Sequence, residues 1–593
     1  MKKNILLKGV AGLLVAAAMT PAVTSCSSDY LDLTPITSIS AADVANSLDG
    51  ARYAMQGLCS SMYRQMRGYP NWNNACGEPY FVTMYGEAQG DGWHDRIWNV
   101  YASNITDWTQ MRQRGSMVAN YMWVYCYGLI KAANMILDNI DNLTLTDAEQ
   151  EKERKYIKAA TLSVRAHAYT HLMQVYGPRW IDSNNGAAIS GVVLRTSQNQ
   201  GNDVPFATTG ELVTHIFTDL DNAIALFNEA GAQSYPIFIP NVNVAHGLKA
   251  RIAAIKAVTK DDWKVVRDEA KAARQGHEIM SADQYVRGGF VTANQEYLWA
   301  TWFQSEGMYY DGHGGTYGCN GWTVLSWGVS AGMDFDLYRK IPISDCRKGL
   351  YIAPGGFLEL NQDLADAHGL TDADFFDATK VNSAAITFNG GAKKDWINFI
   401  NDYALDSSKW PDQTGTDLPL TSPYSNGVFP YYNAAYLVLG LQYKFWGVDT
   451  FATNQFPYMR ASEMGYLEAE AEYEMGNEAA ARAIMVELNK GKRDPNFTCT
   501  ESGTALRDKI RDYKYIELWG EGFRWFDLKR WNVPLKRTAW KAGDVNSGNY
   551  PSKLVTGKCW GVSDKEGWRA SVPSGEFDYN KAVHEEELPG GNY

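Results

Sequence analysis

Beyond its first residues, the sequence lacks any hydrophobic run long enough to cross a membrane. Cysteine is sparse, with eight in 593 residues and none at Cys-x-x-Cys spacing, so neither a disulfide framework nor a cysteine zinc site is indicated. Positive charge is also in short supply, because 55 Lys and Arg stand against 67 Asp and Glu. The resulting net charge of −12 argues against nucleic acids and other polyanions as partners, and favours a neutral or cationic ligand.

The N-terminus supplies the one apolar run. Lys2, Lys3 and Lys8 precede the apolar segment 9–19, and Val23, Ser25 and Cys26 follow at the spacing of a lipobox. A basic start, a short apolar stretch and small residues before a cysteine predict a lipoprotein signal peptide over residues 1–25. We expect Cys26 to become the lipidated N-terminus, which anchors the chain, although simple secretion is the alternative. Removal of the three lysines changes the net charge to −12 − 3 = −15.

Hydrophobic periodicity predicts a mainly α-helical scaffold. Apolar residues recur at helical spacing in residues 120–140 and 149–176. Two further segments, 244–274 and 460–490, each indicate two antiparallel helices with Ala and Gly at the crossing and a short polar turn between them. Such pairs are the unit of a tetratricopeptide-like array, in which several pairs must stack to cover their apolar faces.

Residues 280–450 differ from this scaffold, because helical periods are few and Gly, Trp, Tyr and Asn are frequent. Residues 296–303 alternate like a strand, and residues 296–330 hold nine aromatic residues among seven glycines. A second aromatic stretch is residues 69–101. Rings in glycine-rich loops either fill a small local core or form an exposed ligand face, where flat rings stack on sugars and polar side chains bind hydroxyls.

From these two stretches we select a candidate ligand face, which requires both to converge in the fold. Trp299 and Trp302 are left out, because strand alternation places at least one of them in the core. The residues expected to stack on the ligand are Trp72, Trp93, Trp98, Tyr309, Tyr310, Trp322 and Trp327. The residues expected to bind its hydroxyl groups are Asn73, Asp91 and Asn99.

Several motifs resemble those of the SusD/RagB family of nutrient-binding lipoproteins. The segment from Cys26 to Pro35 is similar to the mature start of these proteins, and residues 165–177 are similar to their Arg-Ala-(aromatic)-x-Tyr helix end. The closing signature Glu-Leu-x-x-Glu-Gly-x-Arg-x-x-Asp-Leu-x-Arg-Trp is present in full over residues 517–531. We interpret this last stretch physically as a closing helix with buried ion pairs.

The resemblance implies a SusD-like fold, which is mainly α with a tetratricopeptide-like scaffold and large loop-rich, aromatic-rich insertions. It predicts one domain over residues 26–593, with the scaffold at about 40–280 and 455–535 and the ligand-binding insertion at about 280–450. It further implies a non-catalytic, surface-exposed outer-membrane lipoprotein. Such a protein binds a glycan and delivers it to a partner SusC-like TonB-dependent transporter.

Other readings stay open or are disfavoured by the residues. The acidic surface also suits a peptide ligand, which is the RagB-type use of the fold, while a glycoside hydrolase needs a carboxylate pair that no motif selects. His167 and His171 have metal-ligand spacing, but no Glu follows His167 as in a zinc peptidase, so we expect no metal there. The acidic run 363–377 lacks a calcium-loop pattern and is interpreted as a solvated helix start. No cofactor is expected.

Overall fold

The computed structural model describes part of the chain, and predictions that fall on other residues, Cys26 and the acidic run 363–377 among them, lie outside it. No helix within the described part is both long and apolar enough to span a lipid bilayer. The described residues are 47–63, 77–95, 108, 110–286, 289–290, 292–302, 331–342, 344–351, 444–445, 455–538, 548, 550 and 568–588.

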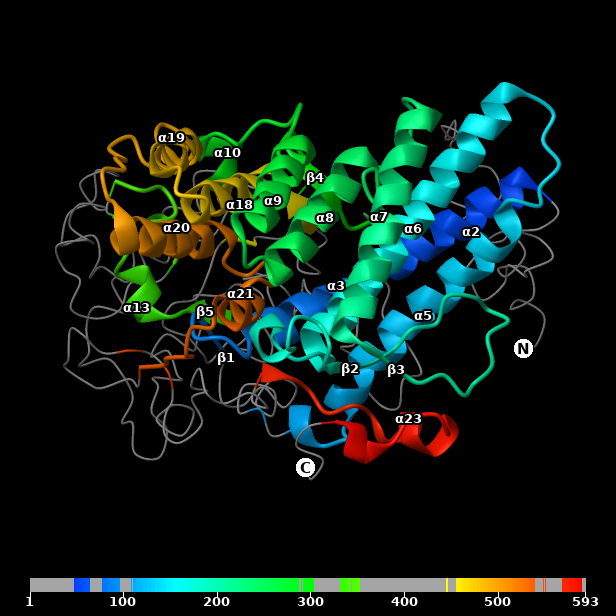
Figure 1. The fold of residues 1–593 in the computed structure, drawn as a ribbon. Helices are drawn as coiled ribbons and strands as arrows, with labels where there is room; N and C mark the ends of the chain where they lie inside the picture. Colours follow the sequence, from blue (N-terminus) through cyan, green and yellow to red (C-terminus); the bar gives the residue numbers. More distant parts are fainter. Residues whose placement is uncertain are drawn as a thin grey trace, which may run out of the picture.

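The scaffold is an array of antiparallel helices (Figure 1). Helix α5 packs on α6, α6 on α7, α7 on α8, and α8 on α9, after which α9 packs on α18, and α18 on α19 and α20. The array thus continues from α9 to α18 across nearly two hundred residues of sequence. Its members are α2 (Leu48–Ser61), α5 (Met117–Ile140), α6 (Ala148–Tyr176), α7 (Thr209–Ala230), α8 (Val242–Lys256), α9 (Lys260–Ala273), α18 (Ala461–Glu474), α19 (Glu478–Asn489), α20 (Gly503–Leu518) and α21 (Arg524–Trp531).

The predicted mainly α, tetratricopeptide-like architecture is confirmed, and the sequence shows locally why these helices form. A capping box of Thr208 and Glu211 begins α7, and Thr259 with Asp262 forms another at the start of α9. Small residues lie where helices cross, as predicted for the two helix pairs. A Cβ on Gly465 of α18 would lie 2.6 Å from the Leu488 side chain of α19, so glycine lets this leucine pack closely against α18.

Among the described residues, short strands form three two-stranded antiparallel sheets. The strand expected within residues 296–303 is observed as β4. Trp299 in this strand is fully buried and its indole N–H donates to the Phe238 carbonyl at 3.0 Å, which confirms the expectation that at least one tryptophan of this run is core. The paired strands are β1 (Trp93–Asp95) with β5 (Ala331–Met333), β2 (Ile189–Val193) with β3 (Phe206–Thr208), and β4 (Tyr297–Ala300) with β6 (Pro457–Arg460).

Shorter helical turns complete the described part. Helix α3 leads directly into η3, a seven-residue π-helix, and π-helices are frequent at functional sites. These turns are α3 (Gly77–Tyr80), η3 (Phe81–Glu87), η4 (Gln110–Arg112), η5 (Trp180–Asp182), α10 (Ala282–Val286), α13 (Phe335–Tyr338), η6 (Lys348–Leu350), α23 (Ser574–Tyr579) and η9 (Glu585–Glu587).

The closing signature is not one helix, so our sequence interpretation of residues 517–531 was wrong on this point. Helix α20 ends at Leu518, and α21 begins at Arg524. Between them the chain turns through Gly520 and Gly522, whose φ angles of +79° and +91° favour glycine. Gly86 of η3 packs so closely on this turn that a Cβ there would lie 2.3 Å from the Gly522 carbonyl oxygen. The signature therefore includes a tight turn at Gly520 and Gly522, and the π-helix η3 packs against this turn at Gly86.

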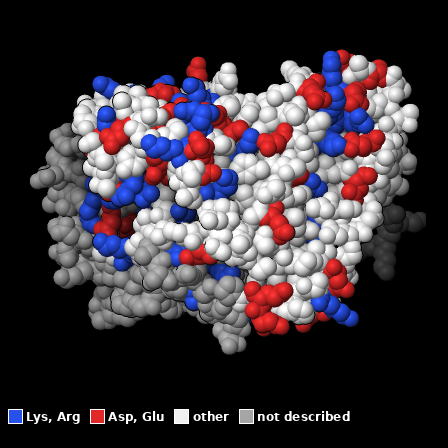
Figure 2. All heavy atoms as spheres, viewed as in Figure 1, with Lys and Arg blue, Asp and Glu red and all other residues white. Residues whose placement is uncertain are grey.

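Charged side chains of both signs are interspersed on the face drawn in Figure 2. Over α9 and its neighbours, for example, Arg274 pairs with Glu468 at 2.7 Å and with Glu487 at 2.6 Å. Glu468 is buried, whereas Glu487 is exposed, and its pair with Arg274 contributes little to stability, on the order of 1 kcal/mol or less.

Candidate functional site

Most of the predicted ligand residues lie outside the described part of the chain. These are Trp72, Asn73, Trp98, Asn99, Tyr309, Tyr310, Trp322 and Trp327. The main chain of Trp93 is described as the first residue of β1, but its side chain is not. The expected ligand contacts of these nine residues therefore stay predictions.

The main chain brings part of the first aromatic stretch beside the residues that follow the second. Strand β1 belongs to the first stretch, and β5 follows directly on the second. They pair antiparallel, with Trp93 opposite Met333 and Asp95 opposite Ala331. Trp519 and Asp334 support this junction, because both donate N–H groups to the Gly92 carbonyl, at 2.7 and 3.0 Å.

Asp91 has a different role from the one that we expected. Its carboxylate is buried and accepts the Arg524 Nε–H at 2.5 Å through Oδ1, while Oδ2 accepts the Lys536 main-chain N–H at 3.2 Å. Both oxygens are thus bound by the protein, and the aspartate holds the segment before β1 against the closing signature. We therefore remove Asp91 from the hydroxyl-binding set.

The closing signature carries the buried ion pairs that the sequence predicted. Asp527 accepts from Lys514 at 2.8 Å and from Arg530 at 2.8 Å, and Arg530 also binds Glu470 through two bonds of 2.8 and 2.6 Å. Arg524, in contrast, turns to Asp91 and not to Asp527. The ion pairs confirm a structural role for this signature.

A second, larger set of buried charges lies beside the signature, and we refer to it as the central ion network. Glu517 is its hub, because its carboxylate accepts from Arg347 at 2.9 Å, from Arg460 at 3.1 Å and from Arg493 at 2.9 Å through each oxygen. Burial alone would raise the pKa of Glu517, but the three arginines hold it well below its ordinary range. The members are Glu296, Asp345, Arg347, Lys444, Arg460, Arg493, Glu517 and Glu521.

This network joins the ends of the predicted insertion to the scaffold. Glu296 precedes β4, Arg347 and Lys444 lie within residues 280–450, and Arg460 ends β6 immediately before α18. Four positive and four negative side chains balance each other there, and all eight are buried. Because a buried charge without a partner costs several kcal/mol, this arrangement fixes the base of the insertion in one geometry.

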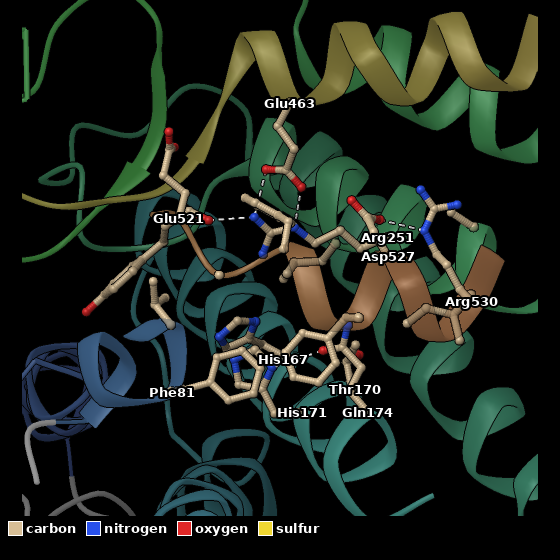
Figure 3. Close-up of a pocket in the computed structure, with 18 of the residues that line it drawn as sticks. Phe81, His167, Thr170, His171, Gln174, Arg251, Glu463, Glu521, Asp527 and Arg530 are labelled. Atoms are coloured by element: carbon tan, nitrogen blue, oxygen red, sulfur yellow. Dashed lines mark hydrogen bonds and ion pairs between the residues drawn. The ribbon is translucent and has the colours of Figure 1, made fainter. Parts of the chain in front are cut away.

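A cavity of about 60 Å³ lies between η3, α6, α8, α18 and α21. Its walls are charged on one side, where Arg251 binds Glu463 and Asp527 binds Arg530, and His167, His171 and Phe81 lie on the other (Figure 3). The volume has room for a few water molecules. It is therefore a small internal site and not the broad face that a glycan would need.

The two histidines meet a carboxylate that the sequence did not reveal. Glu78 of α3 lies 89 residues before His167, yet its Oε1 is 3.0 Å from His167 Nε2 and 2.6 Å from His171 Nε2. All three residues are buried, and one ligand atom from each lies within 4.8 Å of the others. Only the i, i+4 spacing of the histidines was visible in the sequence, since Glu78 stands alone in a stretch without periodicity. This cluster is the part of the described structure that could hold a metal.

One catalytic motif in the sequence lacks the structural context that it needs. Residues 328–332 match the Gly-x-Ser-x-Gly pattern of a nucleophile elbow, in which the serine stands on a turn from a strand into a helix. Here the residues that follow Ser330 form β5, an extended strand, and no helix begins until Phe335. The match therefore does not identify a nucleophile.

Comparison with known proteins gives two family matches. The model of the SusD family matches residues 421–568, and a SusD-like model described as starch-binding associating with outer membrane matches residues 30–253. The first match includes the closing signature and the second includes α6. No curated protein matches the sequence significantly.

Solved structures show the same fold at low sequence identity. A SusD-like carbohydrate binding protein from Bacteroides vulgatus is 16% identical with a TM-score of 0.65, and the alignment covers 92% of this chain and 98% of that one. A putative sugar binding protein from the same species is 18% identical with a TM-score of 0.64, with 92% and 99% covered. A SusD-like carbohydrate binding protein from Bacteroides fragilis is 15% identical with a TM-score of 0.59, with 91% and 100% covered.

Proposed function

This chain belongs to the SusD family, and from that premise we propose that it is a surface-exposed lipoprotein that binds a glycan and delivers it to a partner SusC-like TonB-dependent transporter. The family is one of carbohydrate-binding proteins that associate with the outer membrane. Lipidation of Cys26 would supply the anchor in the outer leaflet. In this role the chain binds its ligand and does not transform it.

The observation that carries the ligand-binding part is the pairing of β1 with β5. This pairing puts residues 93–95 of the first stretch beside residues 331–333, which directly follow the second stretch, and it therefore supports a shared ligand face. Trp327 comes six positions before Met333 in the sequence, so we select it from the second stretch to test one combined face.

The rigid framework at the ends of the predicted insertion supports the same proposal. Binding sites lose less conformational entropy when the loops that carry them start from a fixed framework. The central ion network supplies such a framework, because it ties the residues that flank the insertion to α18 and α20 through buried charges. Ligand specificity then depends on the loop residues, while the framework stays constant.

A glycan array probed with the unlipidated mature chain tests this proposal. We expect binding to one class of oligosaccharide, with Trp327→Ala weakening it tenfold or more, since a stacked ring contributes on the order of 1 kcal/mol and a central anchor more. Tyr579→Ala is the matched control, because Tyr579 is 81% exposed and lies in α23, far in sequence from both stretches. Capture of cationic peptides but no glycan would replace this proposal with peptide uptake.

Delivery and location need separate measurements. The wild-type lipoprotein, solubilised from outer membranes, should co-purify with a TonB-dependent transporter. Protease treatment of intact cells should degrade the chain if it faces outward. Protection from the protease would contradict surface exposure without affecting the glycan-binding result.

A further inference from the structure

We propose that Glu78, His167 and His171 form a binding site for a divalent transition metal of the zinc class. This inference stands on the described geometry and does not depend on the glycan proposal. Two imidazoles and one carboxylate are the donor set of zinc sites that keep a fourth position for water or another ligand.

The donor atoms already converge as such a site requires. His167 and His171 lie on one face of α6, and both direct Nε2 at the same Glu78 oxygen, at 3.0 and 2.6 Å. Around a tetrahedral zinc with bonds of about 2.1 Å, ligand atoms are roughly 3.4 Å apart. The two nitrogen–oxygen distances therefore need to lengthen by less than about 1 Å to admit the ion.

A fourth ligand has a place to bind. The cavity of about 60 Å³ is lined by the three ligand residues together with Phe81, Thr170 and Gln174. A water molecule needs roughly 15 Å³ of such space, so one metal-bound water fits beside the cluster. The π-helix η3 supplies Phe81, whose ring stacks on the His171 ring with centroids 3.6 Å apart. The ring shields one side of the cluster from bulk solvent.

Hydrogen bonds behind the cluster point to the same conclusion. The Tyr125 hydroxyl donates to Glu78 Oε2 at 3.1 Å, which leaves Oε1 as the inward-facing oxygen. His171 Nε2 lies 2.6 Å from the Glu78 carboxylate oxygen, so without a metal its N–H donates there, and coordination would replace this proton with the ion. Nδ1 lies 3.4 Å from Gln174 Oε1, so on coordination it would be placed to donate to this oxygen, as the far ring nitrogen of metal-binding histidines does.

A metal here would connect two parts of the chain. Glu78 belongs to the segment 77–95, which includes η3 and β1, whereas both histidines belong to α6 in the middle of the helical array. Coordination would hold this segment on the scaffold at the cluster, in addition to the Asp91–Arg524 pair. The bound metal would thus fix the segment that carries β1, the strand that pairs with β5.

The test uses tag-free mature protein, stripped with a chelator and titrated with zinc chloride against a chromophoric chelator. We expect the wild type to bind one zinc ion per chain tightly. We expect His171→Ala to bind zinc at least a hundredfold more weakly. The matched control is His246→Ala, which removes a histidine bound to a glutamate, Glu269, at 2.6 Å but outside the cluster. This control should keep the full affinity. Equal loss in both variants, or no tight equivalent in the wild type, would overturn the proposal.

A second variant guards against misfolding of His171→Ala. Tyr125→Phe keeps all three ligands and removes only the hydrogen bond to Glu78, so we expect a ten- to hundredfold weaker site in a folded protein. The melting temperature of the wild type should rise with zinc concentration, because the ion binds the native state. A melting temperature that zinc leaves unchanged, or a Tyr125→Phe affinity equal to the wild type, would contradict the coordination described here.

Discussion

The substitution Glu517→Gln tests the central ion network, and the structure allows its effect to be estimated. Glu517 receives four hydrogen bonds from three arginines, and all four side chains are buried. The network has four positive and four negative side chains. Replacing the Glu517 carboxylate with an amide leaves four positive charges and only three negative ones. The amide NH₂ also faces arginine N–H groups, which are donors as well.

Removing one member of a buried ion pair costs about 3–5 kcal/mol, because the partner charge stays buried without compensation. Glu517 serves three cations, so we expect a loss near the upper end, about 4–5 kcal/mol. A typical domain has a free energy of unfolding of only about 5–15 kcal/mol, so this loss is a large share of the total. The variant should unfold at a markedly lower urea concentration.

The measurement is urea unfolding followed by circular dichroism, with Glu149→Gln as the control. Glu149 pairs with Lys152 at 2.7 Å on the surface, and both side chains are largely exposed. Loss of this pair should change the free energy of unfolding by about 0.5 kcal/mol or less. A Glu517→Gln variant within 1 kcal/mol of the control would show that the network contributes no net stability, and the argument from charge balance would be refuted.

Three further outcomes follow from the described contacts. Arg524→Ala should lower the free energy of unfolding by about 3 kcal/mol, measured by urea unfolding, because it leaves the buried Asp91 without its cation, and Arg524→Lys should restore part of the loss. Burial raises the pKa of Glu87 to about 7 despite bonds from Gly522 and Phe523, so its ionisation opposes folding. Stability should therefore fall by about 3 kcal/mol as the pH rises from 4.5 to 7, and Glu87→Gln should remove this dependence in unfolding measured at pH 5 and pH 8. Cys26→Ala should release the protein from membranes into the soluble fraction, as read by immunoblot, and a variant that stays membrane-bound would contradict lipid anchoring.

The helical scaffold was predictable because its determinants are local. The apolar spacing in residues 149–176 marks α6 almost to the residue, and the Ala and Gly positions of the two helix pairs mark their crossings. The closing signature was harder, since its residue types predict buried ion pairs but not where the chain turns. The positive φ angles of Gly520 and Gly522 decide that, and a helical spacing of charged residues gave no sign of the break.

Features that depend on distant partners were not predictable. Asp91 was read as a ligand residue because it stands among tryptophans and asparagines, yet its partner Arg524 comes 433 residues later. Glu78 gave no signal at all, because a single glutamate becomes a potential metal ligand only when α3 folds against α6. The histidine pair was visible, but without a third donor its spacing predicted nothing beyond a buried helix face.

The sequence separations within the central ion network also set an order of events during folding. Helices α5 to α9 contact their neighbours in the chain, so they can pack soon after they leave the ribosome or the export channel. Glu296 and Arg493 are 197 residues apart, and Arg347 and Glu517 are 170 apart, so their bonds must wait for the C-terminal part of the chain. Until Glu521 has been added to the chain, the four basic and three other acidic side chains of the network lack a complete set of partners.

The network is thus formed late, and contacts that form after the transition state of folding slow unfolding more than they speed folding. A chain held together in this way would resist unfolding for long periods once it is complete, which suits a protein that associates with the outer membrane, where ATP-dependent chaperones are absent.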